Sequence, residues 1–310
     1  MGIAFVFPGQ GSQYVGMGSI MDTQMGEKTR EIGKSVLGDG FLRLLREGPE
    51  EELRQTANTQ PAILLASVAA WRLLDAAGIR ADYLAGHSLG EYSAHVAAGS
   101  LTLEEALRVV RRRGELMEAA VPNGTGTMAA VLGLSSEEVE AACKEVREVG
   151  VAVPANYNSP GQIVISGERA AVEAAMEAAK RRGAKKVIPL SVSGPFHSPM
   201  MQRAAGEFAR VLDEVNWQKP TVPVIANVDG REVTGTERLK ETLVKQLSSA
   251  VRWEQSVCYM AEQGVGTFIE CGPGKVLTGL IKKIVPRAYV VNVEDLPSLE
   301  KSLAYLKESR

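Results

Sequence analysis

Cysteine and histidine are scarce in this chain of 310 residues. The three cysteines, Cys143, Cys258 and Cys271, are too few and too scattered for a disulfide framework, and none belongs to a CxxC pair of the kind that binds metal. The three histidines stand at positions 87, 95 and 197. Any chemistry that needs an imidazole must therefore use one of these three.

Neither sign of charge dominates, and no apolar stretch is long. Lys and Arg together number 35 and Asp and Glu 37, a net charge of −2, whereas a protein that binds nucleic acid over a large surface is usually more basic. The longest apolar run, from Ala62 to Trp71, contains Ser67 and falls well short of the ~18 residues that a membrane span needs. No Lys or Arg precedes Lys28, so the N-terminus lacks the basic start of a secretory signal. We expect a soluble cytoplasmic protein with no nucleic-acid partner and no membrane partner.

The order of predicted strands and helices indicates an α/β fold. Residues 3–7 form an apolar run without alternation, which is typical of a strand buried on both faces. A helix is predicted from Pro61 to Gly78, then a short strand at 83–85, and then a helix that opens with a capping box at Thr102–Glu105. The same rhythm resumes later in the chain, with strands at 223–228, 267–270 and 289–293. Such an alternation places a parallel sheet between layers of helices.

A different pattern occupies residues 124–192. Strand, helix, two strands, helix and strand follow one another there, which is the split βαβ order of ferredoxin-like folds. The predicted strands are 127–132, 151–156, 162–166 and 186–192, and the predicted helices are 136–148 and 168–182. We therefore expect two domains: a large α/β domain made of residues 1–123 and 193–310, and a small ferredoxin-like domain of residues 124–192 inserted into it.

The strongest local motif is Gly86-His-Ser-Leu-Gly90, which lies between a predicted strand and a predicted helix. A G-x-S-x-G sequence in this context is typical of a nucleophile elbow, a tight turn that exposes a serine hydroxyl at the carboxyl edge of a sheet. The helix dipole and the free N–H of Leu89 can then stabilise an oxyanion. The alternative is a chance Gly-Ser turn. We predict that Ser88 is a nucleophile.

A second turn with small residues, Gly9-Gln-Gly11, follows the first predicted strand. Its glycines permit a close approach of the backbone at the same edge of the sheet. Gln10 is therefore either a neighbour of the oxyanion or merely a turn residue.

A nucleophilic serine needs a base, and the few histidines allow elimination. His87 is adjacent to Ser88 and its side chain should point away, while His95 lies two helical turns further on, which suits a structural role. His197, in the loop Ser193-Gly-Pro-Phe-His197, follows the inserted segment and can reach back to the sheet edge. We predict that His197 is the base.

The helix after Thr102 places an arginine among apolar residues. Arg113 lies three or four residues from Val109, Val110, Leu116 and Met117, and it therefore shares their face of the helix. A charge on a buried face needs a partner. Two interpretations stay open: an ion pair with an Asp or Glu elsewhere in the chain, or a guanidinium fork that holds the carboxylate of a ligand.

Five motifs give the sequence a resemblance to a known family. They are Phe7-Pro-Gly-Gln-Gly-Ser-Gln13, Gly86-His-Ser-Leu-Gly-Glu91, Asn158-Ser-Pro-Gly-Gln162, Gly194-Pro-Phe-His-Ser198 and Glu270-Cys-Gly-Pro-Gly-Lys275. Together they resemble the malonyl-CoA:acyl carrier protein transacylases, and the resemblance runs from residue 4 to about residue 293. It implies an α/β-hydrolase-like large domain with a parallel sheet and an inserted ferredoxin-like small domain.

The resemblance also implies a role for six residues. Ser88 matches the family nucleophile and His197 its general base. Arg113 matches the residue that binds the malonyl carboxylate. The backbone N–H groups of Gln10 and Leu89 match the oxyanion donors, and the carbonyl of Gln246 matches the group that orients the histidine.

The implied reaction moves a malonyl group from malonyl-CoA to the phosphopantetheine thiol of acyl carrier protein, through a malonyl ester of serine, for fatty acid biosynthesis. It needs no cofactor besides its substrates. Because the carrier protein is acidic, basic residues are candidates for docking it, although each is also ordinary at a solvated helix end. They are Lys180-Arg-Arg182, Lys185-Lys186 and Lys282-Lys283.

Other functions fit parts of the same pattern. A serine esterase or thioesterase uses the same elbow but needs no arginine on a buried helix face. An acyltransferase for polyketide synthesis differs only in the carrier protein it serves. A non-catalytic docking module would keep the fold and never become acylated.

Overall fold

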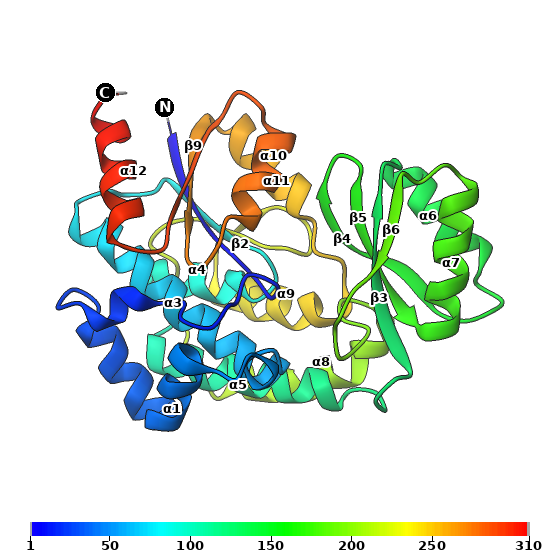
Figure 1. Ribbon diagram of the computed structural model, residues 1–310, viewed down its shortest axis with the longest axis horizontal. Helices are drawn as coiled ribbons and strands as arrows, with labels where there is room; N and C mark the ends of the chain where they lie inside the picture. The colour runs from blue at the N-terminus through cyan, green and yellow to red at the C-terminus, as the bar shows by residue number, and fades with distance from the viewer. Residues whose placement is uncertain (1, 309–310) are drawn as a thin grey trace.

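The computed structural model describes residues 2–308, in which strands form two separate sheets (Figure 1). The larger sheet has the strand order β10-β9-β1-β2-β7-β8 and the smaller one the order β4-β5-β3-β6. Within residues 2–308, no helix has the length and apolar character that crossing a bilayer requires. The mixed α/β class predicted from the sequence is confirmed.

Parallel strands build most of the larger sheet. Its strands are β1 (Gly2–Phe7), β2 (Tyr83–Gly86), β7 (Val224–Ile225), β8 (Glu232–Val233), β9 (Val265–Cys271) and β10 (Tyr289–Val293). Every pairing is parallel except that of β7 with β8. The predicted strands are all present, although β7 is much shorter than the predicted 223–228. Because β1, β2, β7 and β9 run the same way, the loops that follow them meet at one edge of the sheet.

Helices accompany this sheet in sequence and in space. They are α1 (Glu27–Glu47), α2 (Glu50–Leu53), α3 (Thr56–Ala76), α4 (Gly90–Ala97), α5 (Leu103–Ala119), α8 (Gln202–Asp213), α9 (Thr236–Ser248), α10 (Trp253–Glu262), α11 (Val276–Ile284) and α12 (Leu296–Glu308), with short 3-10 turns at Ser19–Asp22 and Pro199–Met201. The predicted capping box is confirmed, because the Thr102 hydroxyl accepts from Glu105 N and the Glu105 carboxylate reaches back to Thr102 N.

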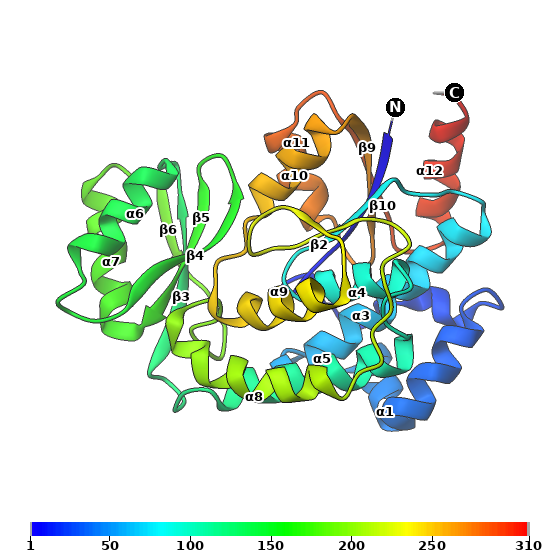
Figure 2. The same cartoon turned by 180° about the vertical axis from the view of Figure 1, so that it is seen from behind.

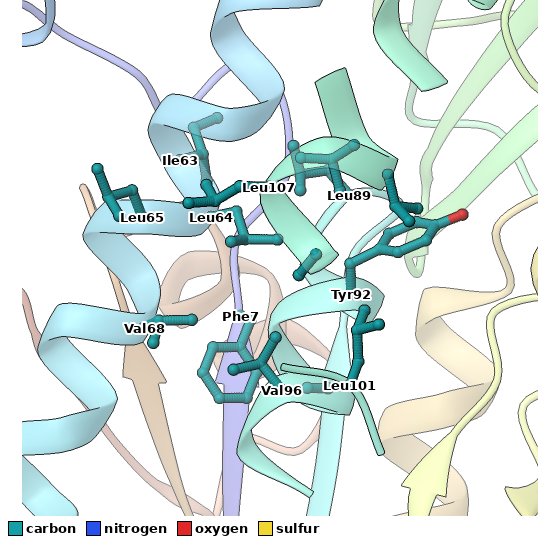
Figure 3. Close-up of a cluster of buried hydrophobic side chains, with 14 of the residues drawn as sticks. Phe7, Ile63, Leu64, Leu65, Val68, Leu89, Tyr92, Val96, Leu101 and Leu107 are labelled. Carbon is teal, nitrogen blue, oxygen red and sulfur yellow. The ribbon is translucent and has the colours of Figure 1, made fainter. Parts of the chain in front are cut away.

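The central strand β1 is buried on both faces. Phe5 and Phe7 belong to the main hydrophobic cluster with α3, α4 and α5, part of which is drawn in Figure 3. Ala4 and Val6 point the other way and belong to a second cluster with α10 and α11. This arrangement explains the apolar run without alternation, since neither face of the strand meets water.

Helix α3 begins earlier than predicted. Its first residue is Thr56, and Pro61 lies inside the helix rather than at its start. The extra turn is held by α5: Thr56 N donates to the Glu118 carboxylate at 2.6 Å. Gly114 of α5 lets the two helices touch, because a Cβ there would lie 2.7 Å from Ala57 Cα. These contacts outweigh the one backbone hydrogen bond that Pro61 cannot make.

The smaller sheet is antiparallel, and its elements follow the predicted order. They are β3 (Gly126–Leu132), α6 (Ser136–Glu145), β4 (Ala152–Ser159), β5 (Gln162–Glu168), α7 (Arg169–Arg181) and β6 (Lys186–Pro189). Helices α6 and α7 cover the face turned away from the larger sheet (Figure 2). Met128 on the opposite face of β3 packs into the main cluster. Strand β6 ends at Pro189, three residues earlier than predicted, and Leu190 and Val192 line a cavity instead.

Candidate active site

The segment between β2 and α4 forms a sharp elbow with Ser88 at its tip. Ser88 has a φ of +50°, a left-handed conformation that a non-glycine residue rarely adopts. A Cβ at Gly86 would overlap the backbone of Gly90, and a Cβ at Gly90 would overlap the carbonyl of Phe7. Glycine is therefore required at both positions, as predicted from the motif.

Asn227 holds this elbow from the end of β7. Its Oδ1 accepts a hydrogen bond from Ser88 N at 2.7 Å, and its Nδ2 donates to Gly86 O at 2.7 Å. The Asn227 side chain is completely buried. The sequence reasoning did not identify this residue, because the predicted strand 223–228 included it, whereas in the structure β7 ends at Ile225 and Asn227 follows it.

His197 lies beside Ser88, although 109 residues separate them in the chain. Ser88 Oγ and His197 Nε2 are 2.8 Å apart, and His197 Nδ1 is 2.7 Å from the backbone carbonyl of Gln246. A carbonyl can only accept, so Nδ1 carries the proton and Nε2 is the free acceptor in the neutral ring. This is the tautomer that can take a proton from a serine hydroxyl.

Burial keeps the ring of His197 neutral. Loss of hydration, with the positive charge of Arg113 as a second cause, lowers the pKa of His197 to about 3. His197 also has a φ of +58°. Ser88 and His197 are the only non-glycine residues with positive φ among residues 2–308, and such strain persists only where the surrounding structure enforces it.

Arg113 is 1% exposed and points at the same hydroxyl. Its Nη2 donates to Ser88 Oγ at 3.1 Å and to Gln246 Oε1 at 2.8 Å, and its Nη1 donates to Gln60 Oε1 at 2.9 Å. Arg113 forms no salt bridge with a carboxylate of the described chain. Of the two interpretations left open by the sequence, the direct ion pair is therefore wrong.

The two residues expected to supply the oxyanion donors line one cavity. Gln10 and Leu89 line the cavity beside Ser88, and neither backbone N–H has an acceptor within residues 2–308. The side chain of Gln10 is held by Thr56, to which its Nε2 donates at 3.3 Å. Paired free N–H groups beside a nucleophile can receive the negative charge of a tetrahedral intermediate.

The cavity has a volume of about 110 Å³ and lies between the two sheets. Its lining combines the polar residues described above with apolar ones, which are Met117, Met128, Leu190, Val192 and Phe196. The space is small and suits a short acyl group that ends in a charge. Its apolar walls strengthen electrostatic interactions inside it.

The side chain of Gln246 forms a second set of contacts under Ser88. Its Nε2 donates to Ser88 O at 3.0 Å and to the Glu91 carboxylate at 2.7 Å, while its Oε1 accepts from Arg113. Glu91 is completely buried, and loss of hydration raises its pKa to about 7. Neither Glu91 nor Gln60 was singled out in the sequence, because a polar residue in a helix gives no sign of its partner.

The two other histidines differ in position. Nε2 of His87 pairs with Asn158 Oδ1 at 2.8 Å rather than with Ser88, although His87 is among the residues that line the cavity. His95 is completely buried with its ring edge against Trp217, and neither ring nitrogen has a hydrogen-bond partner in the described chain. Burial lowers the pKa of His95 to about 3, and its position fits the structural role expected of it.

A serine elbow, an imidazole in hydrogen-bond contact and a pair of free N–H groups are typical of enzymes that carry an acyl group as a serine ester. The guanidinium beside the hydroxyl is a group that can pair with a carboxylate. Comparison with protein families agrees with this class. The acyl transferase domain family matches residues 4–303, and the chain belongs to that family.

The relatives are similar over nearly their whole length. The chain is 47% identical to malonyl CoA-acyl carrier protein transacylase of Bacillus subtilis, over 99% of this chain and 98% of the relative. Among solved structures, an acyl carrier protein S-malonyltransferase from Vibrio cholerae superposes with a TM-score of 0.95 at 46% identity, covering 97% of this chain and 100% of that one. A malonyl-transacylase in complex with a type II PKS acyl-carrier protein has a TM-score of 0.95 at 45% identity, covering 98% and 100%.

Proposed function

We propose that this protein transfers the malonyl group of malonyl-CoA to acyl carrier protein for fatty acid biosynthesis. The observation that carries the proposal is the buried guanidinium of Arg113, whose Nη2 lies 3.1 Å from Ser88 Oγ. A malonyl ester on Ser88 would carry its free carboxylate only two carbons from the ester oxygen. That carboxylate would reach the guanidinium without strain.

The first step forms the malonyl ester. Ser88 Oγ attacks the thioester carbonyl of malonyl-CoA while His197 Nε2 takes the hydroxyl proton. The N–H groups of Gln10 and Leu89 stabilise the oxyanion, and the loss of one such donor typically costs about 3–4 kcal/mol of barrier. Coenzyme A then leaves as a thiol with the proton that His197 held.

The second step reverses the first with a new acceptor. His197 takes the proton of the phosphopantetheine thiol of acyl carrier protein, and the thiolate attacks the ester. The ester bond to Ser88 breaks and Ser88 Oγ recovers its proton. In both steps Arg113 pairs with the malonyl carboxylate and positions the acyl group, and the Gln246 carbonyl keeps His197 in the productive tautomer.

Arg113→Lys tests the role of the guanidinium. The substitution keeps the charge and removes the bidentate fork, so we expect malonyl-enzyme formation to slow at least tenfold. Arg112→Lys is a matched control, because Arg112 is the preceding residue of α5 and is exposed in an ion pair with Glu115. Intact-mass spectrometry after mixing with malonyl-CoA measures the ester. Malonylation of Arg113→Lys at the rate of Arg112→Lys would show that the carboxylate binds elsewhere.

The same experiment separates the other candidate functions. An esterase or thioesterase would hydrolyse its ester quickly in water, whereas a transferase ester should persist and discharge to a pantetheine thiol. A docking module would show no mass increase. Service to a polyketide carrier stays a second candidate because one relative is described in complex with a type II PKS acyl-carrier protein. Discharge rates to carrier proteins of the two pathways distinguish them.

Of the basic candidates for docking the carrier protein, we favour Lys185 and Lys283. They line one surface hollow, of about 670 Å³, and neither forms a salt bridge in the described part of the chain. Lys180, Arg181 and Arg182 are instead paired with Glu177 or Glu145. Turnover with carrier protein should fall steeply with added salt, while turnover with a small thiol should not.

We also propose the domain division expected from the sequence. Residues 1–123 and 193–310 form an α/β-hydrolase-like domain, and residues 124–192 form a ferredoxin-like domain. The antiparallel order β4-β5-β3-β6 and the separate hydrophobic cluster under α6 and α7 support it. The proposed steps use no cofactor besides the substrates, and the cytoplasmic location stays a prediction.

A further inference from the structure

The guanidinium of Arg113 is buried without a carboxylate in contact, yet the carboxylate of Glu91 is linked to it through a single intervening side chain. Gln246 stands between the two groups: its Oε1 accepts from Arg113 Nη2 at 2.8 Å, and its Nε2 donates to Glu91 Oε2 at 2.7 Å. The amide therefore connects the positive group to a negative one through two hydrogen bonds. A charge buried this deeply needs such compensation.

Glu91 is fixed in place by more than this amide. The same Oε2 accepts from Asn227 N at 3.0 Å, and Oε1 has no hydrogen-bond partner in the described chain. The carboxylate is completely buried and lies in the first turn of α4, three residues after Ser88. The charged and titratable groups that act on it are Arg113 from α5, Asp229 after β7 and its neighbour Tyr92.

We propose that Glu91 is the resident counter-charge of Arg113 and limits how tightly the site holds the malonyl carboxylate. It is a positioning residue, because it acts through Gln246 and Arg113 and does not touch the acyl group. The inference rests on the proposed malonyl transfer. When the malonyl carboxylate pairs with Arg113, the buried region gains a second negative charge. That charge is opposed by Glu91, since like charges repel strongly in a water-poor site.

Glu91→Gln removes the negative charge and keeps the shape, and its amide oxygen can still accept from Gln246 and Asn227. At pH 8, above its pKa of about 7, Glu91 is mostly ionised. We expect the malonyl-CoA concentration that gives half-maximal acylation to fall there at least about fivefold, which corresponds to about 1 kcal/mol. Acetyl-CoA lacks the free carboxylate, so its half-maximal concentration should not change. Glu91→Asp keeps the charge, so it should retain the wild-type ratio of the half-maximal concentrations of malonyl-CoA and acetyl-CoA.

Glu270→Gln is the matched control. Glu270 is also completely buried, burial raises its pKa to about 7, and its oxygens accept from Leu277 N and Thr278 N at the start of α11. It makes no contact with Arg113 or Gln246. Its substitution should leave the ratio of the half-maximal concentrations of malonyl-CoA and acetyl-CoA unchanged, even if it lowers the melting temperature.

The outcomes separate this inference from the proposed function. Wild-type protein that forms no malonyl ester refutes the malonyl transfer itself. The second outcome is a wild-type protein that forms the ester and a Glu91→Gln variant whose half-maximal malonyl-CoA concentration is unchanged, or rises together with that for acetyl-CoA. This outcome refutes only the role of Glu91 as counter-charge.

A measurement on the wild-type protein tests the inference even if the Glu91→Gln variant fails to fold. Ester formation with release of the coenzyme A thiol consumes no proton overall. Binding of malonyl-CoA near pH 7 should nevertheless take up protons from weakly buffered solution, because the second negative charge drives Glu91 to protonate. Acetyl-CoA should cause no uptake. Equal proton uptake with the two thioesters would overturn the inference.

Discussion

Replacing Asn227 with alanine should destabilise the protein through the elbow that carries Ser88. The Asn227 side chain satisfies two buried backbone groups, Ser88 N–H and Gly86 C=O, each at 2.7 Å. Leaving a buried polar group without a partner costs about 1–3 kcal/mol, so the two groups together should cost roughly 2–6 kcal/mol of the free energy of unfolding. Asn292→Ala is the control, because Asn292 is half-buried and makes one long bond of 3.4 Å to Gly274 O.

Activity should fall further than stability alone explains. Ser88 keeps its left-handed backbone only while the surrounding hydrogen bonds enforce it, and a relaxed elbow moves the hydroxyl away from His197. Urea unfolding measures the stability of Asn227→Ala, Asn292→Ala and wild type, and intact mass measures the rate of acylation at a temperature where all are folded. If Asn227→Ala loses less than about 1 kcal/mol and acylates at the wild-type rate, Asn227 does not hold the elbow.

Two further predictions concern acid stability and metals. The pKa of His95 is about 3 in the folded protein and about 6.5 in the unfolded chain. Between these pH values only the unfolded chain binds a proton at His95, so the folded protein loses stability as pH falls below 6.5. His95→Phe removes this loss, so relative to wild type it should gain about 2 kcal/mol between pH 7 and pH 5 in urea unfolding; parallel pH profiles would contradict the argument. Dialysis against a chelator should leave malonyl transfer unchanged, since every proposed step uses groups of the chain, and a loss restored by added metal would disprove this.

The parts of the fold that the sequence predicts well are those encoded locally. The apolar run of residues 3–7 reports burial on both faces, and the capping box at Thr102–Glu105 fixes a helix start by contacts within one turn. The start of α3 was mispredicted because it is decided elsewhere. Thr56 is held by Glu118 from α5, 62 residues away, and no local pattern around Pro61 contains that contact.

The candidate site divides in the same way. The elbow of Ser88 depends on glycines within two residues, so the motif predicts its backbone. For Arg113 the helical period predicts which face of the helix it occupies but not which groups it contacts. Only the structure shows that the guanidinium donates to two glutamine side chains rather than to carboxylates. Asn227 contacts Ser88 across 139 residues of chain, and an asparagine after a strand is too common to single out without that geometry.

The neutral partner of His197 is consistent with a site built for an acidic acyl group. In many serine enzymes a carboxylate holds the histidine, but here such a group would be a further buried anion near Arg113, besides Glu91, and would compete with the malonyl carboxylate. The Gln246 carbonyl selects the same tautomer without charge. The resting imidazole is then a weak base, in part because the positive charge of Arg113 lowers the pKa of His197. In the proposed mechanism, a malonyl carboxylate paired with Arg113 would offset that charge and raise the pKa of His197. The substrate with the carboxylate would then strengthen the proposed base of Ser88.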